Sequence, residues 1–184
     1  MKSKFSIFVI VSSLLLVVSS CSNSSQSKPS AVVEEQQLGD NQILNIMMTV
    51  DRGEIAAAQE ATKKAVSPIV SGYAKYLIEQ HQSNLEHLSQ LSEELKLEPK
   101  ESAISNSLIA DGKNGLKALG ELQGKAFDKA FIDAMVKGHQ GGLKLIDSKL
   151  VPETKNPELK ASVAQFRQMV STHLEKGLEI QKSL

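Results

Sequence analysis

The 184-residue sequence has few of the residues on which several classes of function depend. It has no tryptophan and only 4% aromatic residues, which leaves little material for a base-stacking platform or a sugar-binding cleft. Its 21 basic and 21 acidic residues balance without forming a basic block, so nucleic-acid binding has no electrostatic support. One cysteine is too few for an internal disulfide framework.

The N-terminus also lacks an apolar run long enough to span a membrane. Lys2 and Lys4 precede about 14 mainly apolar residues, Phe5 to Val18, whereas a spanning helix needs roughly 20. A positive start, a short apolar run and small residues before a cleavage site are typical of an export signal. The end of this run, Val18-Ser19-Ser20-Cys21, resembles the lipobox of bacterial lipoproteins. We therefore predict that Cys21 is lipidated and becomes the first residue of the mature chain.

Three parts follow along the chain: a lipoprotein signal peptide over 1–20, a lipidated cysteine with a disordered tether over 21–40, and a helical domain over 41–184. The tether is rich in Ser and Gln and too poor in large apolar side chains to order itself. This organisation predicts a periplasm-facing protein that is anchored to a membrane of the cell envelope by its lipid. Ser22 after the lipidated cysteine favours the outer membrane over the inner one.

Apolar residues in the folded part recur at three- and four-residue intervals, and no stretch alternates as a strand does. The spacing predicts four long amphipathic helices, over about 41–65, 68–96, 124–150 and 157–181. Asn156 is a plausible N-cap before Pro157, and "VPETKNPE" is expected to break the chain after Leu150. Residues 99–123 contain glycines and predict a shorter, less regular helical segment. The fold class is therefore all-α: a ferritin-like four-helix bundle with an extra short segment in the long second connection.

Each predicted long helix places one side chain of a metal-ligand type near the centre of its apolar stripe. At 100° per residue these are Glu54, His81, His139 and His173, whereas His87 falls on the surface. Glu54 and His81 lie almost equally far from the first turn, near mid-bundle. His139 and His173 differ by about five residues in their distance from the second turn, or roughly 7 Å of helical rise.

Two other polar residues point inward. Asp128 lies three turns from His139, too far to share an ion, and is expected to complement the dipole of its own helix. Asn84 lies one turn from His81 and is either a hydrogen-bond partner of that imidazole or a satisfied core amide.

The four inward residues support two interpretations. One carboxylate and three imidazoles suit a divalent transition metal, Zn, Fe, Mn or Cu, and a buried carboxylate needs a partner. The paired Glu-x-x-His motifs of di-iron bundles are missing, so a mononuclear site is favoured over a dinuclear oxidase. Such a site could store or buffer the metal or carry out redox chemistry with it; the sequence does not decide whether the protein is an enzyme and leans against it. The alternative is a non-catalytic envelope protein with structural, interaction or stress functions, in which the Glu–His network only fixes the core. Haem ligation ranks lowest, because few aromatic residues could surround a porphyrin.

The segments "DRGEIAAAQEA", "YAKYLIEQHQSNLEHL", "AFDKAFIDAMVKGHQGGLKLID" and "ELKASVAQFRQMVSTHLEKG" occur in this order. Together they resemble the bacterial domain-of-unknown-function 4142 family. The resemblance implies an exported, ferritin-like four-helix protein with Glu at 54 and His at 81, 139 and 173. The sequence departs from the family pattern at Gln80, where an acidic residue is usual, and at Met169-Val170, where Leu-Pro is usual.

Overall fold

The computed structural model describes residues 37–184, so the predicted signal peptide, Cys21 and most of the tether lie outside the described residues. The part of the chain that it describes is helical nearly throughout. Its elements are α1 (Asp40–Lys64), α2 (Pro68–Leu95), α3 (Ala103–Gly120), α4 (Gly124–Leu145), a π-helix η1 (Ile146–Leu150), α5 (Val151–Glu153) and α6 (Pro157–Ser183). None of the helices within 37–184 is long and apolar enough to cross a membrane.

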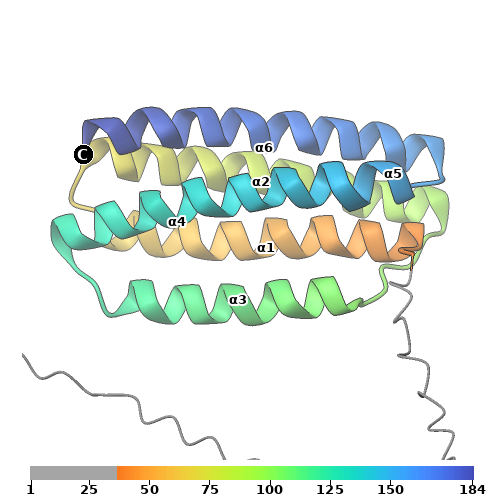
Figure 1. The fold of residues 1–184 in the computed structure, drawn as a ribbon, viewed down its shortest axis with the longest axis horizontal. Coiled ribbons are helices and arrows are strands. Elements are labelled where there is room, and N and C mark those ends of the chain that lie inside the picture. The colour runs from red at the N-terminus through yellow and green to blue at the C-terminus, as the bar shows by residue number, and fades with distance from the viewer. Residues whose placement is uncertain (1–36) are drawn as a thin grey trace, which may run out of the picture. The chain divides into compact units, whose positions relative to one another are not determined.

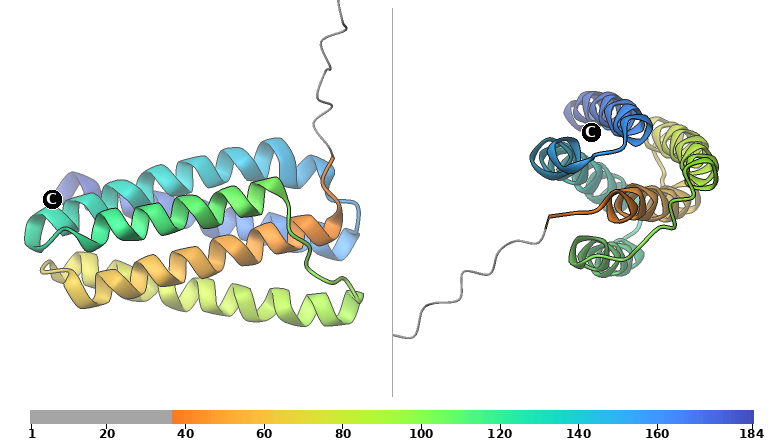
Figure 2. Two further views of the ribbon diagram at one scale, coloured as in Figure 1. Left: turned by 90° about the horizontal axis from the view of Figure 1, so that it is seen from below. Right: turned by 90° about the vertical axis from the view of Figure 1, so that its right-hand side faces the viewer.

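Helices α1, α2, α4 and α6 form a four-helix bundle, and α3 lies outside it against α1 (Figures 1 and 2). The pairs α1–α2 and α4–α6 are antiparallel hairpins, as Figure 1 shows. The long connection through α3 returns the chain to the starting end, so that α2 and α4 run in the same direction. One long crossover of this kind is the ferritin-like arrangement. The predicted all-α bundle is confirmed.

The extra segment in the long connection is more regular than its glycines predict. It forms the single helix α3 of 18 residues. The Ser102 side chain accepts a hydrogen bond from the backbone N–H of Ser105 and caps the helix. Ile104 and Leu108 pack against the bundle core. Capping and burial of one face thus outweigh the low helix propensity of the two internal glycines.

The prediction of a break after Leu150 is wrong, because the helix continues to Glu153 through η1 and α5. Within an ordinary α-helix, Pro152 would collide with the carbonyl four residues earlier. The chain instead widens into a π turn, in which the N–H of Val151 donates to the carbonyl of Ile146. The sharp end comes at Asn156, whose side chain accepts from two backbone N–H groups and caps α6, as predicted.

The core consists of two apolar clusters, one toward each end of the bundle. On α2, for example, Leu77 belongs to one cluster and Leu88 to the other. The buried residues Asp51, His81 and His173 each lie between members of the two clusters along their own helix. The bundle therefore has a polar layer between two apolar halves.

Packing begins a few residues before the first helix. Leu38 is buried, and its backbone N–H donates to the Glu153 carboxylate at 2.6 Å. The Asp40 carboxylate accepts from the backbone N–H groups of Lys155 and Asn156. These bonds fix the start of α1 to the turn before α6.

Candidate metal centre

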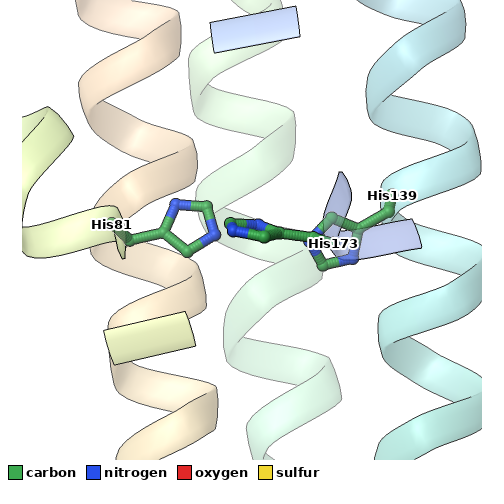
Figure 3. Close-up of side chains that lie close together, drawn as sticks. All are labelled: His81, His139 and His173. Carbon is green, nitrogen blue, oxygen red and sulfur yellow. The ribbon is translucent and has the colours of Figure 1, made fainter. Parts of the chain in front are cut away.

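Three histidines from three helices meet in the polar layer. His81 on α2, His139 on α4 and His173 on α6 are all buried, and each offers one ring nitrogen within 4.8 Å of the others. The ring centroid of His173 lies 4.9 Å from that of His81 and 5.3 Å from that of His139. Figure 3 shows the ring of His173 between the other two. The structure thus brings together the three imidazoles that the sequence places on inward faces.

The extension of α4 explains why His139 and His173 meet despite the expected mismatch in height. His139 lies 14 residues before Glu153, the true end of its helix, and His173 lies 16 residues after Pro157. The difference is two residues instead of about five. The error in the sequence analysis came from the helix end, and the inward faces were correct.

Glu54 lies beside the histidines but stands apart from their ligand set. It lines a small cavity together with His81 and His139, and its Oε2 is buried without a hydrogen-bond partner among residues 37–184. The atoms that lie within 4.8 Å of one another come from the three histidines and do not include this carboxylate. Gly138 faces it from α4, where a Cβ would lie 3.7 Å from Oε1.

The cavity is small and mostly apolar. Its volume is about 30 Å³, and Val50, Ile146 and Phe166 form part of its wall. This volume holds about one water molecule, whereas pockets for drug-sized ligands measure roughly 300–1,000 Å³. A porphyrin does not fit, so the haem interpretation is disfavoured. An ion with at most one water does fit.

Five buried side-chain atoms of the layer have no hydrogen-bond partner in the part of the chain that the structure describes. They are Glu54 Oε2, His81 Nε2, His139 Nε2 and both ring nitrogens of His173. Each such atom costs about 1–3 kcal/mol when it remains unpaired. A network that merely fixed the core would join these atoms to one another. The arrangement instead leaves these atoms unpaired among residues 37–184, with one ring nitrogen of each histidine within 4.8 Å of the others.

The protonation of two histidines is suited to coordination. The Nδ1 of His139 lies 2.7 Å from the carbonyl of Met135, which can only accept, so in the neutral imidazole Nδ1 carries the proton and Nε2 keeps the lone pair. Burial, together with the nearby His81, His139 and Lys176, lowers the pKa of His173 to about 3. His173 is therefore neutral near pH 7, the state in which an imidazole binds a metal.

Asp51 is a buried member of this layer that the sequence analysis missed. Its exposed fraction is 0%, and its Oδ1 lies 2.8 Å from Nδ1 of His81. The amide of Asn84 donates to its other oxygen at 2.8 Å, so Asn84 contacts the carboxylate and not the imidazole. Burial raises the pKa of Asp51, against the opposing effect of the His81 and Asn84 hydrogen bonds. The sequence does indicate that Asp51 points inward, because Met47, Asp51 and Glu54 follow one another at helical spacing on one face of the helix.

The other polar residues singled out in the sequence have structural partners. Asp128 accepts from the backbone N–H groups of Val66 and Ser67, just before α2. Its charge therefore serves the start of a neighbouring helix, and the role expected within its own first turn is wrong. His87 is exposed, as predicted, and its Nε2 lies 3.0 Å from Ser162 Oγ.

Fold and site together define an all-α, ferritin-like bundle with a buried three-histidine centre. The chain belongs to the family described as domain of unknown function DUF4142, whose sequence profile matches residues 24–180. The family resemblance of the sequence is thus confirmed. No curated protein matches the sequence.

Two solved structures share the fold. One is a DUF305 protein from Streptomyces coelicolor that is described as secreted; it is 13% identical, with a TM-score of 0.64 over 77% of this chain and 90% of that chain. The other is CopM in the Cu(II)-bound form, 19% identical, with a TM-score of 0.62 over 80% of this chain and 99% of that one. At these identities the likeness shows the fold alone.

Proposed function

We propose that the protein binds one divalent transition-metal ion at the centre formed by His81, His139 and His173, with the Glu54 carboxylate as a fourth ligand. One observation carries the proposal: the three histidines place buried nitrogens within 4.8 Å of one another. Nε2 of each ring has no hydrogen-bond partner among the described residues. Imidazole and carboxylate are ligands that Zn, Fe, Mn and Cu accept.

The geometry is close to what coordination requires. A metal–imidazole bond is about 2.0 Å long, so nitrogens that share one ion in a tetrahedral site lie roughly 3.3 Å apart. Nitrogens up to 4.8 Å apart must therefore approach one another by up to about 1.5 Å. Among the described residues no hydrogen bond to either ring nitrogen of His173 opposes such a movement.

Among the four metals, Cu(II) is the first to test. A site of nitrogen and oxygen donors without sulfur favours a divalent ion over Cu(I), and Cu(II) forms the strongest complexes of the first-row divalent series. The structural neighbour CopM is described in a Cu(II)-bound form, which supports the same choice. Zn(II) is the second candidate, because three imidazoles and a carboxylate also suit it.

The centre is suited to holding an ion and not to turning over a substrate. Its ligands come from four helices of one bundle, and the adjoining cavity of about 30 Å³ has no room for an organic substrate. A catalytic metal site keeps an open position that a substrate can reach. We therefore infer a binding function such as buffering or storage of the metal.

The proposed location is the cell envelope, with the bundle facing the periplasm. The support comes from the export signal, the lipobox ending at Cys21 and the description of the DUF305 neighbour as secreted. Cys21→Ser is expected to release the protein from membranes, and continued membrane fractionation of that variant would contradict lipidation. Ser22 favours the outer membrane, which density-gradient separation of the two membranes tests.

Metal analysis of the mature chain tests the proposed centre directly. The chain from Ser22 onward is purified, dialysed against Cu(II) or Zn(II), and its bound metal is counted. Wild type should hold one ion, and His139→Ala should lose it. His87→Ala is the matched control, because it removes an exposed imidazole outside the layer. Equal, sub-stoichiometric metal in all three proteins would refute the proposal and favour a structural histidine cluster.

A further inference from the structure

Asp51 is directed at His81, and both of its oxygens are already engaged. Oδ1 lies 2.8 Å from Nδ1 of His81, and Oδ2 accepts from the Asn84 amide at 2.8 Å. Its side chain is fully buried, one turn before Glu54 on α1. Asp51 is absent from the group of mutually close ligand atoms. Its contact with the centre therefore passes through the His81 ring.

We propose that Asp51 is a positioning residue, which keeps the proton of His81 on Nδ1 and so directs the lone pair of Nε2 into the shared centre. The consequence for metal binding rests on the proposed function. The placement of the proton does not, and it can be measured in metal-free protein.

The hydrogen-bond inventory supports this assignment. An ionised carboxylate only accepts, so a bond between Asp51 and Nδ1 requires the proton on that nitrogen. The amide of Asn84 donates to the other oxygen and favours the ionised carboxylate. Nε2 of His81 is buried and has no partner among residues 37–184, so it is the nitrogen left for a ligand. A carboxylate behind a ligating imidazole fixes the ring and raises its basicity.

The three histidines differ in how their rings are held. His139 is held by a backbone carbonyl, that of Met135, which no side-chain substitution removes. Within residues 37–184, His173 has no hydrogen bond at either ring nitrogen. His81 is thus the ring in the set whose proton position depends on a replaceable side chain. This difference makes the role of Asp51 separable from the roles of the ligands.

A buried Asp–His pair can also be purely structural, so the test needs a readout that stability alone does not change. Long-range ¹H–¹⁵N correlation spectra of ¹⁵N-labelled mature chain in EDTA report which ring nitrogen carries the proton. In wild type, Nδ1 of His81 should be protonated. In Asp51→Asn the amide can present either its oxygen or its NH₂ group to the ring, so both tautomers should be populated. Asp147→Asn, which alters an exposed carboxylate bound to Arg167, should leave His81 unchanged.

A competition titration with Cu(II) then measures the effect on affinity. Asp51→Asn should bind about 10–100-fold more weakly than wild type and Asp147→Asn, because loss of an outer-shell partner has effects of this size. Asn84→Ala, which frees the other oxygen of Asp51, should shift the affinity in the same direction by less. If Asp51→Asn fails to fold, as judged by circular dichroism, the His81 tautomer and the Cu(II) affinity are both measured in Asn84→Ala instead.

The outcomes separate this inference from the proposed function. A His81 ring with an unprotonated Nδ1 in wild type, or tautomer and affinity both unchanged in Asp51→Asn, would overturn the positioning role. Wild-type protein that takes up no Cu(II) or Zn(II) would refute the metal centre, while the spectra would still decide where Asp51 holds the proton.

Discussion

Replacing His173 by leucine should make the metal-free protein more stable. The imidazole is fully buried, and neither of its nitrogens has a hydrogen-bond partner among the described residues. Leucine has a similar volume and no polar atom to leave unpaired. The substitution therefore removes a desolvation penalty without opening a large hole.

The expected gain follows from two opposing effects. Each unpaired buried nitrogen costs about 1–3 kcal/mol. The substitution also removes the edge contact between His173 and Tyr76, whose ring centroids lie 5.4 Å apart, and this loss reduces the gain in stability by roughly 0.5–1.5 kcal/mol. For two nitrogens less this contact, we expect the free energy of unfolding to rise by about 0.5–5.5 kcal/mol in EDTA. For a domain of this size, Tm should rise by about 2–4 °C for each kcal/mol.

Urea and thermal unfolding followed by circular dichroism measure this change. His87→Gln is the matched control, because an amide can still bond Ser162, and it should change stability by no more than about 0.5 kcal/mol. Adding Cu(II) should stabilise wild type and leave His173→Leu unchanged. A variant that is less stable than wild type in EDTA, with the same m-value, would show that His173 is a structural core residue and would refute the reasoning.

Four further outcomes follow from the same structure. The folded pKa of His173 is about 3, against 6.5 unfolded, so between these values the unfolded chain binds a proton that the folded one does not. Metal-free protein should therefore lose stability as the pH falls from 6.5 to 3, at up to about 1.4 kcal/mol per pH unit, and pH-dependent urea titrations should show a flatter profile for His173→Leu. Glu54→Gln should weaken Cu(II) binding by about tenfold or more, or at least 1.4 kcal/mol by calorimetry, and unchanged affinity would remove Glu54 from the ligand set. Asp128→Ala should cost about 1–3 kcal/mol in urea unfolding, since two backbone N–H groups lose their acceptor, with the metal content unaffected. Gly177→Ala should be destabilising in the same assay, because its Cβ would lie 3.2 Å from both the Tyr73 hydroxyl oxygen and Val136 Cγ2; a variant as stable as wild type or more so would mean that these neighbours yield and that the higher helix propensity of alanine outweighs the contact.

The bundle and the meeting of the histidines were predictable because they depend on local periodicity. Helices repeat every 3.6 residues, so the inward faces carrying His81, His139 and His173 can be computed without coordinates. Pro68 and Asn156 mark helix starts through local backbone chemistry. In an antiparallel hairpin, residues equally far from the turn lie at the same level along the bundle, so their relative heights can also be predicted from the sequence.

The remaining features depend on contacts that periodicity does not encode. The π turn before Pro152 lets the helix continue where a proline normally ends it, and this shifted the expected height of His139. Asp51 was missed because inward direction alone does not distinguish a residue that supports a ligand from one that binds the ion. Only the 2.8 Å contact with His81 makes that distinction.

The polar layer also determines how the proposed metal and the fold depend on each other. Each half of the bundle has its own apolar cluster, and the layer between them holds five buried atoms without a hydrogen-bond partner among the described residues. We therefore expect this layer to be the part of the core that is least stable without a ligand. An ion bound there would join α2, α4 and α6 through three histidines and would give their nitrogens a partner. An ion that binds only the folded state stabilises it by mass action, by about 2.7 kcal/mol at a hundredfold excess over Kd. Because the ion would lie in the polar layer, metal binding should first protect the middle of these helices from local opening. Hydrogen exchange of the amides around His81 and His139 should therefore slow on metal addition, while amides of the outer helix α3 should exchange as before. Uniform slowing across all helices would indicate global stabilisation and would contradict a layer that opens locally.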